Sequence, residues 1–446
     1  LAYLTAMMIA NGGTAKRPFE TVIDDLYPMA AGIGSRVDKE MTVFSGTVHR
    51  EKYDDFYALF REALLEPGFR DEDFERVKSD VRTQIETVLR RTDDEELGKE
   101  VLYAEIYAGH PYGHTNYGTL DGLDAITLDD VRAFHRQFYT PDRLTIGMAG
   151  GFSRGAARRI RADFEGPAVT AKPASAHREL DLPEPVRLDR NQMTIVQKQA
   201  LATGMHIGFP IDVTRGHPDW PALWLVRSYL GEHRSENSHL YQRLRELRGL
   251  NYGDYAYIEY FPNGGSQFHP PPNVARQQQI FQIWLRPVPP ENAPFAFKGA
   301  LYELEKLCRE GMTQQDFEAT RNYLSKFVSL LVKTESRQLG YALDSEFYEI
   351  GPFADYVREG LEKLTLDDVN RVIREHLRAN RMQFVVVTED AEGFRDHLLG
   401  EAPTPITYQS KPSEDVLAED EVIERLRIEL RPEDVEILPV GQVFQR

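Results

Sequence analysis

The chain has 446 residues, of which 41% are hydrophobic and 28% charged, a globular composition with enough apolar residues for two cores. Its formal net charge of −18 argues against binding to nucleic acids or anionic membranes, since both need clustered Lys and Arg. No apolar run approaches the roughly eighteen residues that span a bilayer, and the single cysteine, Cys308, excludes an internal disulfide and a cysteine-based metal site.

The chain opens with Leu1 rather than Met, inside an apolar segment with the pattern of a helix, and shows no signal peptide. We expect a truncated N-terminus, which leaves the compartment open between bacterial periplasm and cytoplasm. Residues 41–48 have the composition of a strand. Over residues 72–92, apolar side chains recur at intervals of three and four, which predicts an amphipathic helix that starts at the acidic residues 71–73.

An internal repeat organises the rest of the chain. Ile126-Thr-Leu-Asp-Asp-Val returns as Leu364-Thr-Leu-Asp-Asp-Val, with the shared threonines 238 residues apart (365 − 127). Gly68-Phe-Arg-Asp-Glu-Asp-Phe returns as Gly311-Met-Thr-Gln-Gln-Asp-Phe at an offset of 243 (311 − 68). Two matches at nearly one offset indicate two copies of one domain.

The copies should share one topology. At the first offset Arg143 matches Arg381, and each precedes an apolar segment, 144–149 and 382–387, that predicts a strand. We expect the first copy to lack its opening strands, because the chain starts inside what should be the first helix.

Composition sets the boundaries. The first copy takes residues 1–165, and the proline-rich residues 166–186 are predicted to be a stiff linker. The second copy takes residues 187–390, and residues 391–446 form an acidic tail that is predicted to be a solvated surface. Helices and strands do not alternate regularly, so we expect an α+β fold in which each copy layers helices on one face of an antiparallel-rich sheet.

These motifs, in this order, resemble the pitrilysin/insulinase family of zinc peptidases. The resemblance rests on the opening helix with Asn11-Gly-Gly-Thr, on His110-Pro-Tyr-Gly, on Tyr139-Thr-Pro-Asp-Arg and on Leu244-Arg-Glu-Leu-Arg-Gly-Leu-Asn-Tyr-Gly. The family's inverted motif, His-x-x-Glu-His, puts two zinc-binding histidines on one helix face with the general base between them. The resemblance implies a further glutamate, on a later helix, as the third protein ligand.

At these positions the chain carries Tyr3, Ala6 and Met7, and the third-ligand position falls at Gln84, with Glu86 as the alternative if the alignment shifts. Tyrosine and methionine are poor zinc ligands, alanine cannot accept a proton, and an amide is a weaker ligand than a carboxylate. We expect these side chains to be ordinary packing and this chain to bind no metal. We expect the zinc ion to be bound by a separate, catalytic half of the enzyme.

A second functional pair is intact. The resemblance implies that Arg245 holds the substrate backbone and that Tyr252 stabilises the oxyanion of the tetrahedral intermediate, both acting in a partner's site. The pattern places Arg245 beside an apolar stripe of Leu240, Leu244 and Leu247, on a short helix that ends at Gly249, with Tyr252 opening the next strand. Without the family match, a surface ion pair and a half-buried strand aromatic would explain the two residues.

The other candidates have plainer explanations. His110 and His114 lie in a turn rich in Pro and Gly, and His233 and His239 lie in a polar loop that is predicted to contact solvent or substrate rather than metal. The tyrosines at 252–260 are consistent both with a peptide groove and with a half-buried strand.

The sequence therefore predicts a non-catalytic half of a zinc metallopeptidase, a pseudo-peptidase with no peptidase activity alone. It would complete a peptide-binding chamber as a heterodimer with a catalytic subunit, or as the downstream half of a longer chain. The alternative is a structural or assembly subunit with no peptidase role. No binding to nucleic acid and no membrane span are expected.

Overall fold

The computed structural model describes residues 1–165, 180–408 and 412–446. They form two compact units, one of Leu1–Arg91, His114–Pro183 and Phe444–Arg446, the other of Thr92–Gly113 and Glu184–Val443. Within the described ranges, no helix is long and apolar enough to cross a membrane. Most of the predicted linker, residues 166–179, lies outside the described residues.

The first unit is mainly helical. Its only sheet among the described residues is an antiparallel pair in which Gly34 lies opposite Ser45 and Val37 opposite Thr42, so the strand predicted at 41–48 is present but shorter. The helix predicted at 72–92 is confirmed. The elements are α1 (Ala2–Asn11), α2 (Phe19–Leu26), β1 (Gly34–Val37), β2 (Thr42–Ser45), α3 (Tyr53–Leu65), α4 (Asp71–Thr83), its π-helical continuation η3 (Gln84–Thr92), α6 (Leu120–Ala125), α7 (Leu128–Phe138) and α8 (Arg154–Glu165).

The strand predicted at residues 144–149 is wrong. These residues are not in a strand, and Leu144 and Ile146 are 43% and 44% exposed. Their counterpart in the second copy is β7 (Gln383–Thr388), which is a strand because it is hydrogen-bonded on both sides, to β3 (Gln192–Gln197) and β4 (Thr203–Ile211). No described strand of the first unit pairs with residues 144–149, and an apolar pattern alone cannot form a β-ladder.

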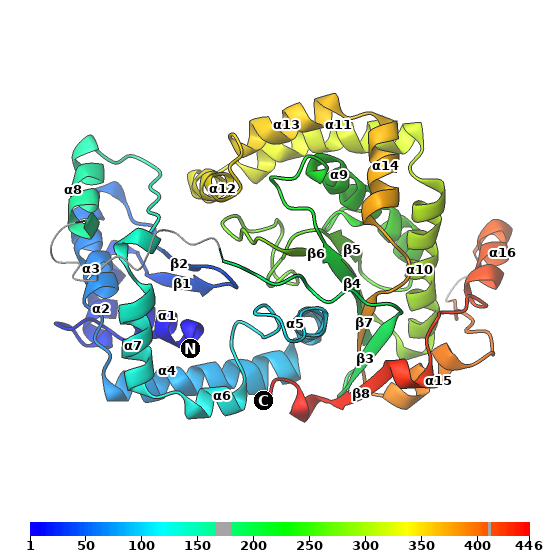
Figure 1. The fold of residues 1–446 in the computed structure, drawn as a ribbon, viewed down its shortest axis with the longest axis horizontal. Coiled ribbons are helices and arrows are strands. Elements are labelled where there is room, and N and C mark those ends of the chain that lie inside the picture. The colour runs from blue at the N-terminus through cyan, green and yellow to red at the C-terminus, as the bar shows by residue number, and fades with distance from the viewer. Residues whose placement is uncertain (166–179, 409–411) are drawn as a thin grey trace. The chain divides into compact units, whose positions relative to one another are not determined.

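The second unit is built around one mixed sheet with the strand order β5-β6-β4-β7-β3-β8. Helices α9, α10 and α14 cover one face of the sheet, and α5 covers the other (Figure 1). The remaining elements are α5 (Asp94–Ile106), α9 (Trp220–Gly231), the π-helical η5 (Tyr241–Glu246), β5 (Asp254–Tyr257), β6 (Gln279–Val288), α10 (Ala293–Glu310), α11 (Gln314–Leu331), α12 (Glu335–Phe347), α13 (Phe353–Lys363), α14 (Leu366–His376), α15 (Ala391–Leu399), α16 (Glu414–Ile423) and β8 (Val435–Pro439).

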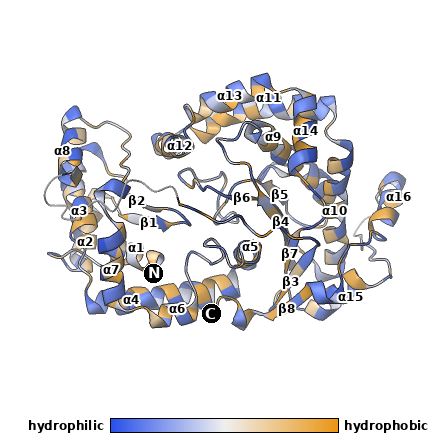
Figure 2. Ribbon diagram, in the orientation of Figure 1, coloured by the Kyte–Doolittle hydropathy of each residue, from blue (hydrophilic) through white to orange (hydrophobic). Residues whose placement is uncertain are grey.

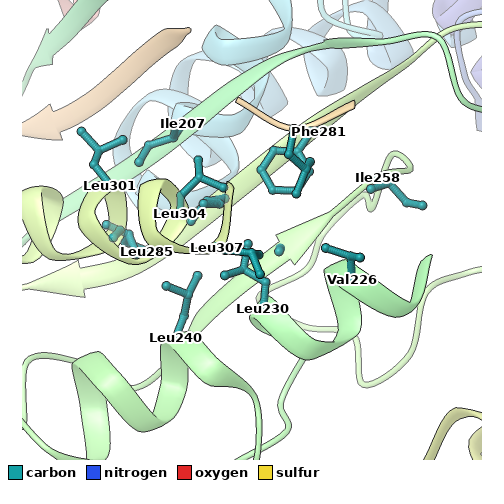
Figure 3. Close-up of a cluster of buried hydrophobic side chains, with 14 of the residues drawn as sticks. Ile207, Val226, Leu230, Leu240, Ile258, Phe281, Leu285, Leu301, Leu304 and Leu307 are labelled. Carbon is teal, nitrogen blue, oxygen red and sulfur yellow. The ribbon is translucent and has the colours of Figure 1, made fainter. Parts of the chain in front are cut away.

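The sheet is buried on both faces. Every residue of β4 is buried, and alternate side chains of a strand point to opposite faces. On one face, Ile207 packs with side chains of β6, α9 and α10 in the large core (Figure 3). On the other, a Cβ added to Gly98 of α5 would lie 2.5 Å from the ring of His206. Only a glycine lets α5 approach the sheet this closely.

The repeat is confirmed by local structure. Thr127 and Thr365 each begin a helix, α7 and α14, with the same reciprocal capping box to an aspartate three residues on. Such a cap stabilises a helix by about 1 kcal/mol. Phe74 and Phe317, which match at the second offset, are both buried near the starts of α4 and α11. Hydrophobic and hydrophilic residues mix along these helices (Figure 2), as expected of helices with one buried face.

The compact units do not follow the predicted boundaries 1–165, 187–390 and 391–446. Residues 92–113 of the first copy belong to the second unit, because α5 packs on β4 and β7. Residues 391–443 of the predicted solvated tail also belong there: β8 extends the sheet in parallel beside β3, and Phe394 and Leu398 of α15 are buried. Residues 92–113 and the tail thus both pack their apolar side chains against residues that are distant in the sequence, which composition cannot predict.

We predict that His206 makes the second unit sensitive to acid. Burial lowers the pKa of His206 to about 3, whereas an unfolded histidine titrates near 6.5. Between these values only the unfolded state takes up the proton, so stability falls as pH drops, by up to about 1.4 kcal/mol per pH unit. His206→Gln should therefore lose less melting temperature than the wild type between pH 7 and pH 5. Equal losses in thermal scans would contradict this.

Candidate functional site

The three zinc-motif positions of helix α1 pack into the first unit. Ala6 is fully buried. The ring of Tyr3 meets Tyr117 edge-on, with centroids 5.0 Å apart. The sulfur of Met7 lies 3.7 Å from hydroxyl and amide groups of Ser35 and Asn11. Each of the three positions thus holds a side chain that packs and that offers neither a histidine nitrogen nor a carboxylate.

The third-ligand position does not restore a metal site. Gln84 is the first residue of η3 and is half-buried. It lies next to the buried face of the helix, which is formed by Val77, Val81 and Ile85. The alternative, Glu86, is 42% exposed and faces Arg82. π-Helical segments often lie at functional sites, but an amide, a phenol and a thioether do not provide the donor set that zinc prefers. The residues present do not fit a zinc ion.

One cluster elsewhere in the described ranges brings metal-ligand residue types together: Asp219, Glu375 and His376 of the second unit. Arg371 donates to Asp219 and to Glu375 at 2.6 Å each, and Nε2 of His376 lies 2.9 Å from Asp219. The bond from Arg371 contributes most to lowering the pKa of Asp219 to about 2, and His376 adds to this effect. A guanidinium already supplies the positive charge, so this cluster is an ion-pair network.

The predicted Arg245 helix is π-helical, and its stripe is shorter than predicted. Leu240 and Leu244 are buried, but Leu247 is 41% exposed. The periodicity of an α-helix would bring Leu247 back to the buried face, whereas the wider turn of η5 and its end at Glu246 rotate it out. Gly249 ends the segment with a φ of +68°, as predicted from the tolerance of glycine for left-handed backbone.

Arg245 and Tyr252 lie close together at the surface. The guanidinium carbon of Arg245 is 5.8 Å from the ring centroid of Tyr252 and 4.9 Å from that of Tyr241. Its Nη1 contacts the hydroxyl of Tyr241 and, at 2.8 Å, Glu246. The Arg245 side chain is 31% exposed and Tyr252 is 77% exposed. Cation and phenol can thus donate hydrogen bonds to one bound group.

Tyr252 does not open the strand, as was predicted, but lies in the loop before it. Strand β5 begins at Asp254, the first residue in ladder register with β6, and the carbonyl of Gly253 before it accepts from the amide of Arg286. The side chain of Asn251 holds this loop, with its Nδ2 donating to Asp254 Oδ1 at 2.7 Å and its Oδ1 accepting from the amide of Gly253. The exposed phenol therefore stands on a hydrogen-bonded turn.

Sequence reasoning missed Asp254, which lies behind the pair. Its side chain is fully buried, and burial raises its pKa to about 7, although the bond from Asn251 and the charge of Arg245 oppose the rise. An acidic residue immediately before a run of buried strand residues was the available signal, because a carboxylate at such a position is costly unless it is paired or protonated.

The other histidine and tyrosine candidates are structural. Tyr255 and Tyr257 are buried with Trp284 on the α5 face of the sheet, which excludes a peptide groove there. His233, predicted to contact solvent or substrate, is instead buried between the hydroxyl of Tyr257 and the carbonyl of Gln267, at 2.8 Å each, and burial lowers its pKa to about 4.

His239 also has internal partners, because it contacts the hydroxyl of Tyr229 at 3.1 Å and the buried Glu303 at 2.7 Å. His110 lies in a turn, as predicted, and its Nδ1 accepts from the amide of Tyr112. Each of these three histidines has a hydrogen-bond partner within the protein, which supports a structural role.

The order of domains along the chain matches a known family. Residues 1–120 match the profile described as Insulinase (Peptidase family M16), and residues 125–324 match the profile described as Peptidase M16 inactive domain. Residues 325–446, which include the tail, lie outside both matches. The resemblance inferred from the motifs is thereby confirmed.

Named relatives agree with this assignment. An uncharacterized zinc protease of Mycobacterium tuberculosis is 24% identical over 299 residues, 66% of this chain and 63% of the relative. The chain thus matches somewhat less than two thirds of that relative's length. The mitochondrial-processing peptidase subunit beta of Caenorhabditis elegans is 20% identical over 158 residues, 35% of this chain and 34% of the relative.

A solved structure shares the fold. The structure described as a peptidase M16 inactive domain, from Pseudomonas fluorescens, has 22% identity and a TM-score of 0.73, and covers 86% of this chain and 87% of its own. The α+β class with two homologous domains is thereby confirmed. With one family matched in both halves and the same fold over most of its length, the chain belongs to the M16, or insulinase, family of peptidases.

Proposed function

We propose that this chain is a non-catalytic half of a zinc metallopeptidase, which completes a peptide-binding chamber and supplies Arg245 and Tyr252 to a catalytic half. The observation that carries the proposal is the contact between the guanidinium of Arg245 and the exposed ring of Tyr252. The four zinc-site positions of the same chain hold side chains that do not fit the metal. A chain that has Arg245 and Tyr252 but lacks zinc ligands is suited to assist a separate catalytic half.

The two groups would act through hydrogen bonds. Arg245 is a permanent cation with several N–H donors, suited to the carbonyl oxygens of an extended peptide. The hydroxyl of Tyr252 can donate to an oxygen that gains negative charge as the peptide carbonyl is attacked. Donors fixed in place before the reaction lower such barriers by a few kcal/mol. The hydrogen-bonded turn at Asn251 provides this fixation for the phenol.

The partner is proposed to be a catalytic M16 subunit, or the upstream part of a longer chain. One relative is described as a subunit of a mitochondrial peptidase, which supports a two-component arrangement in the family. The substrate class is peptide, and the acidic surface, with a formal charge of −18, favours basic segments through long-range attraction.

Activity of a reconstituted enzyme tests the proposal. The chain is combined with a candidate catalytic M16 subunit that carries the His-x-x-Glu-His motif and is assayed on a fluorogenic peptide library. Tyr252→Phe should lower kcat about 10- to 1,000-fold with little change in KM, because the hydroxyl acts mainly on the transition state. Arg245→Ala should also raise KM, since the guanidinium contacts bound substrate.

Tyr27→Phe is the matched control, because Tyr27 is 85% exposed in the first unit and has no proposed role. Full turnover in both site variants would favour the rival function, a structural or assembly subunit. If the chain is such a subunit, the Tyr252→Phe and Arg245→Ala chains should still assemble normally with its partner.

We predict that the purified chain holds far less than one zinc per molecule. Tyr3, Ala6, Met7 and Gln84 offer no histidine or carboxylate ligand. Elemental analysis after dialysis against a low concentration of zinc provides the measurement. A protein with the four substitutions Tyr3→His, Ala6→Glu, Met7→His and Gln84→Glu is the comparison. About one tightly bound zinc per wild-type chain would refute the prediction.

We predict that Asp254→Asn stabilises the second unit above pH 7. The folded protein holds the Asp254 proton up to about pH 7, whereas the unfolded chain releases it near pH 4. As pH rises through this window, the folded state of the wild type loses up to about 1.4 kcal/mol per pH unit from this group. The asparagine variant lacks this loss, and its Oδ1 can still accept from Asn251.

The melting temperature of Asp254→Asn should therefore exceed that of the wild type at pH 8, and the difference should shrink towards pH 5. A difference that is constant with pH would show that Asp254 is ionised throughout, or that asparagine acts through packing alone.

A further inference from the structure

The acidic tail contacts the segment that carries Arg245. Helix α16 contains the neighbouring carboxylates Glu419 and Asp420, about 170 residues after η5 in the sequence. Asp420 is 5% exposed and also bonds to the hydroxyl of Tyr408. Neither carboxylate lies in the solvated surface that the composition of the tail predicts.

Two arginines that flank Arg245 bind these carboxylates. The side chain of Arg248 is fully buried, with Nε 2.8 Å from Asp420 and Nη2 2.7 Å from Glu419. Its Nη1 also donates to the carbonyl of Arg243 at 2.8 Å, so one guanidinium ties the start of the turn to the tail. Arg243 contacts Glu419 as well and donates to Glu303 of α10 at 2.6 Å.

Arg245 is held differently. Its guanidinium lies over tyrosine rings and pairs with the adjacent Glu246, which is itself 47% exposed. Three arginines within six residues repel one another, and the tail acids neutralise the two that point inward. A buried charge that loses its partner is strongly destabilising, so these two ion pairs hold the segment in place.

Other contacts hold part of this segment, because Leu244 and Leu250 are buried in the large core and Asn251 bonds to Asp254. Residues 247–253 form neither helix nor strand, and Leu247 and Tyr252 are exposed. η5 is π-helical, a conformation that is rare outside specific tertiary contacts. A loop of this composition is expected to open locally at low energetic cost unless it is anchored.

We propose that Glu419 and Asp420 of the tail are positioning residues for Arg245 and Tyr252: by binding Arg243 and Arg248, they fix the π-helical turn from which both side chains project. The effect on catalysis rests on the function proposed above, whereas the effect on local order does not. The tail would thus be part of the site's architecture, although it lies outside the regions that match the family.

Hydrogen exchange on the intact chain tests the anchor. Wild type is compared with Glu419→Gln, with the conservative Glu419→Asp, and with Glu421→Gln, whose carboxylate is exposed on the same helix. Glu419→Gln should speed amide exchange in residues 241–253 by about tenfold or more, while strand β4 keeps its protection. Glu421→Gln should match the wild type, and Glu419→Asp should restore part of the protection.

Unchanged exchange at residues 241–253 in a folded Glu419→Gln chain would overturn the proposal, as would an equal increase in β4. If Glu419→Gln does not fold, Arg243→Gln provides the second variant, because Arg248 and Asp420 keep their bond. The same local increase is then expected, and its absence overturns the proposal.

The reconstituted enzyme gives a second readout. Glu419→Gln should lower kcat and also raise KM, because it positions both side chains. The loss of kcat should largely disappear in the Tyr252→Phe background, because that part of the effect acts through the hydroxyl. Fully additive effects would exclude positioning of Tyr252. An enzyme inactive even with the wild-type chain would refute the proposed function, and the exchange result would still decide whether the tail anchors the turn.

Discussion

The burial of one sheet on both faces is the constraint on which the second unit depends. Helices α9 and α10 cover one face of β4, and α5 covers the other at a distance that only Gly98 permits. Unpaired charge is therefore disfavoured on both faces, which accounts for a neutral His206 and for the aromatic cluster around Trp284. The rigid sheet then gives the short strand β5, and the loop before it, a fixed base.

Electrostatics adds what hydrophobic packing does not provide at the candidate site. The loop from η5 to β5 contains the buried Leu250 but also the exposed Leu247 and Tyr252, so apolar burial holds it only in part. Ion pairs of Arg243 and Arg248 and hydrogen bonds of Asn251 add to this burial. These contacts reach α10, the tail and β6, and each ties the loop to a part of the unit that has its own core. Arg245 and Tyr252 can then remain accessible without the loop being free to move.

The zinc-site positions show how a helix keeps its fold after its metal chemistry changes. Tyr3, Ala6 and Met7 occupy one helical face, as the family's ligands would, but each makes packing contacts within the first unit. Ala6 is fully buried, and Tyr3 and Met7 are half-buried against the core of the first unit. This agrees with a chain in which the fold of the family persists while the reactive groups are divided between two halves.

The sequence by itself determined the features that depend on a few neighbouring residues. The helix over 72–92 and the turn at Gly249 could be predicted, as could the family and the duplication. The tertiary structure decided that α5 and residues 391–443 belong to the second unit, that residues 144–149 pair with no described strand, and that Leu247 is exposed while His233 and Asp254 are buried. Capping and periodicity arise from contacts within one or two turns of chain. Strand pairing, burial and pKa depend on which distant surface covers a residue, and no local pattern specifies that.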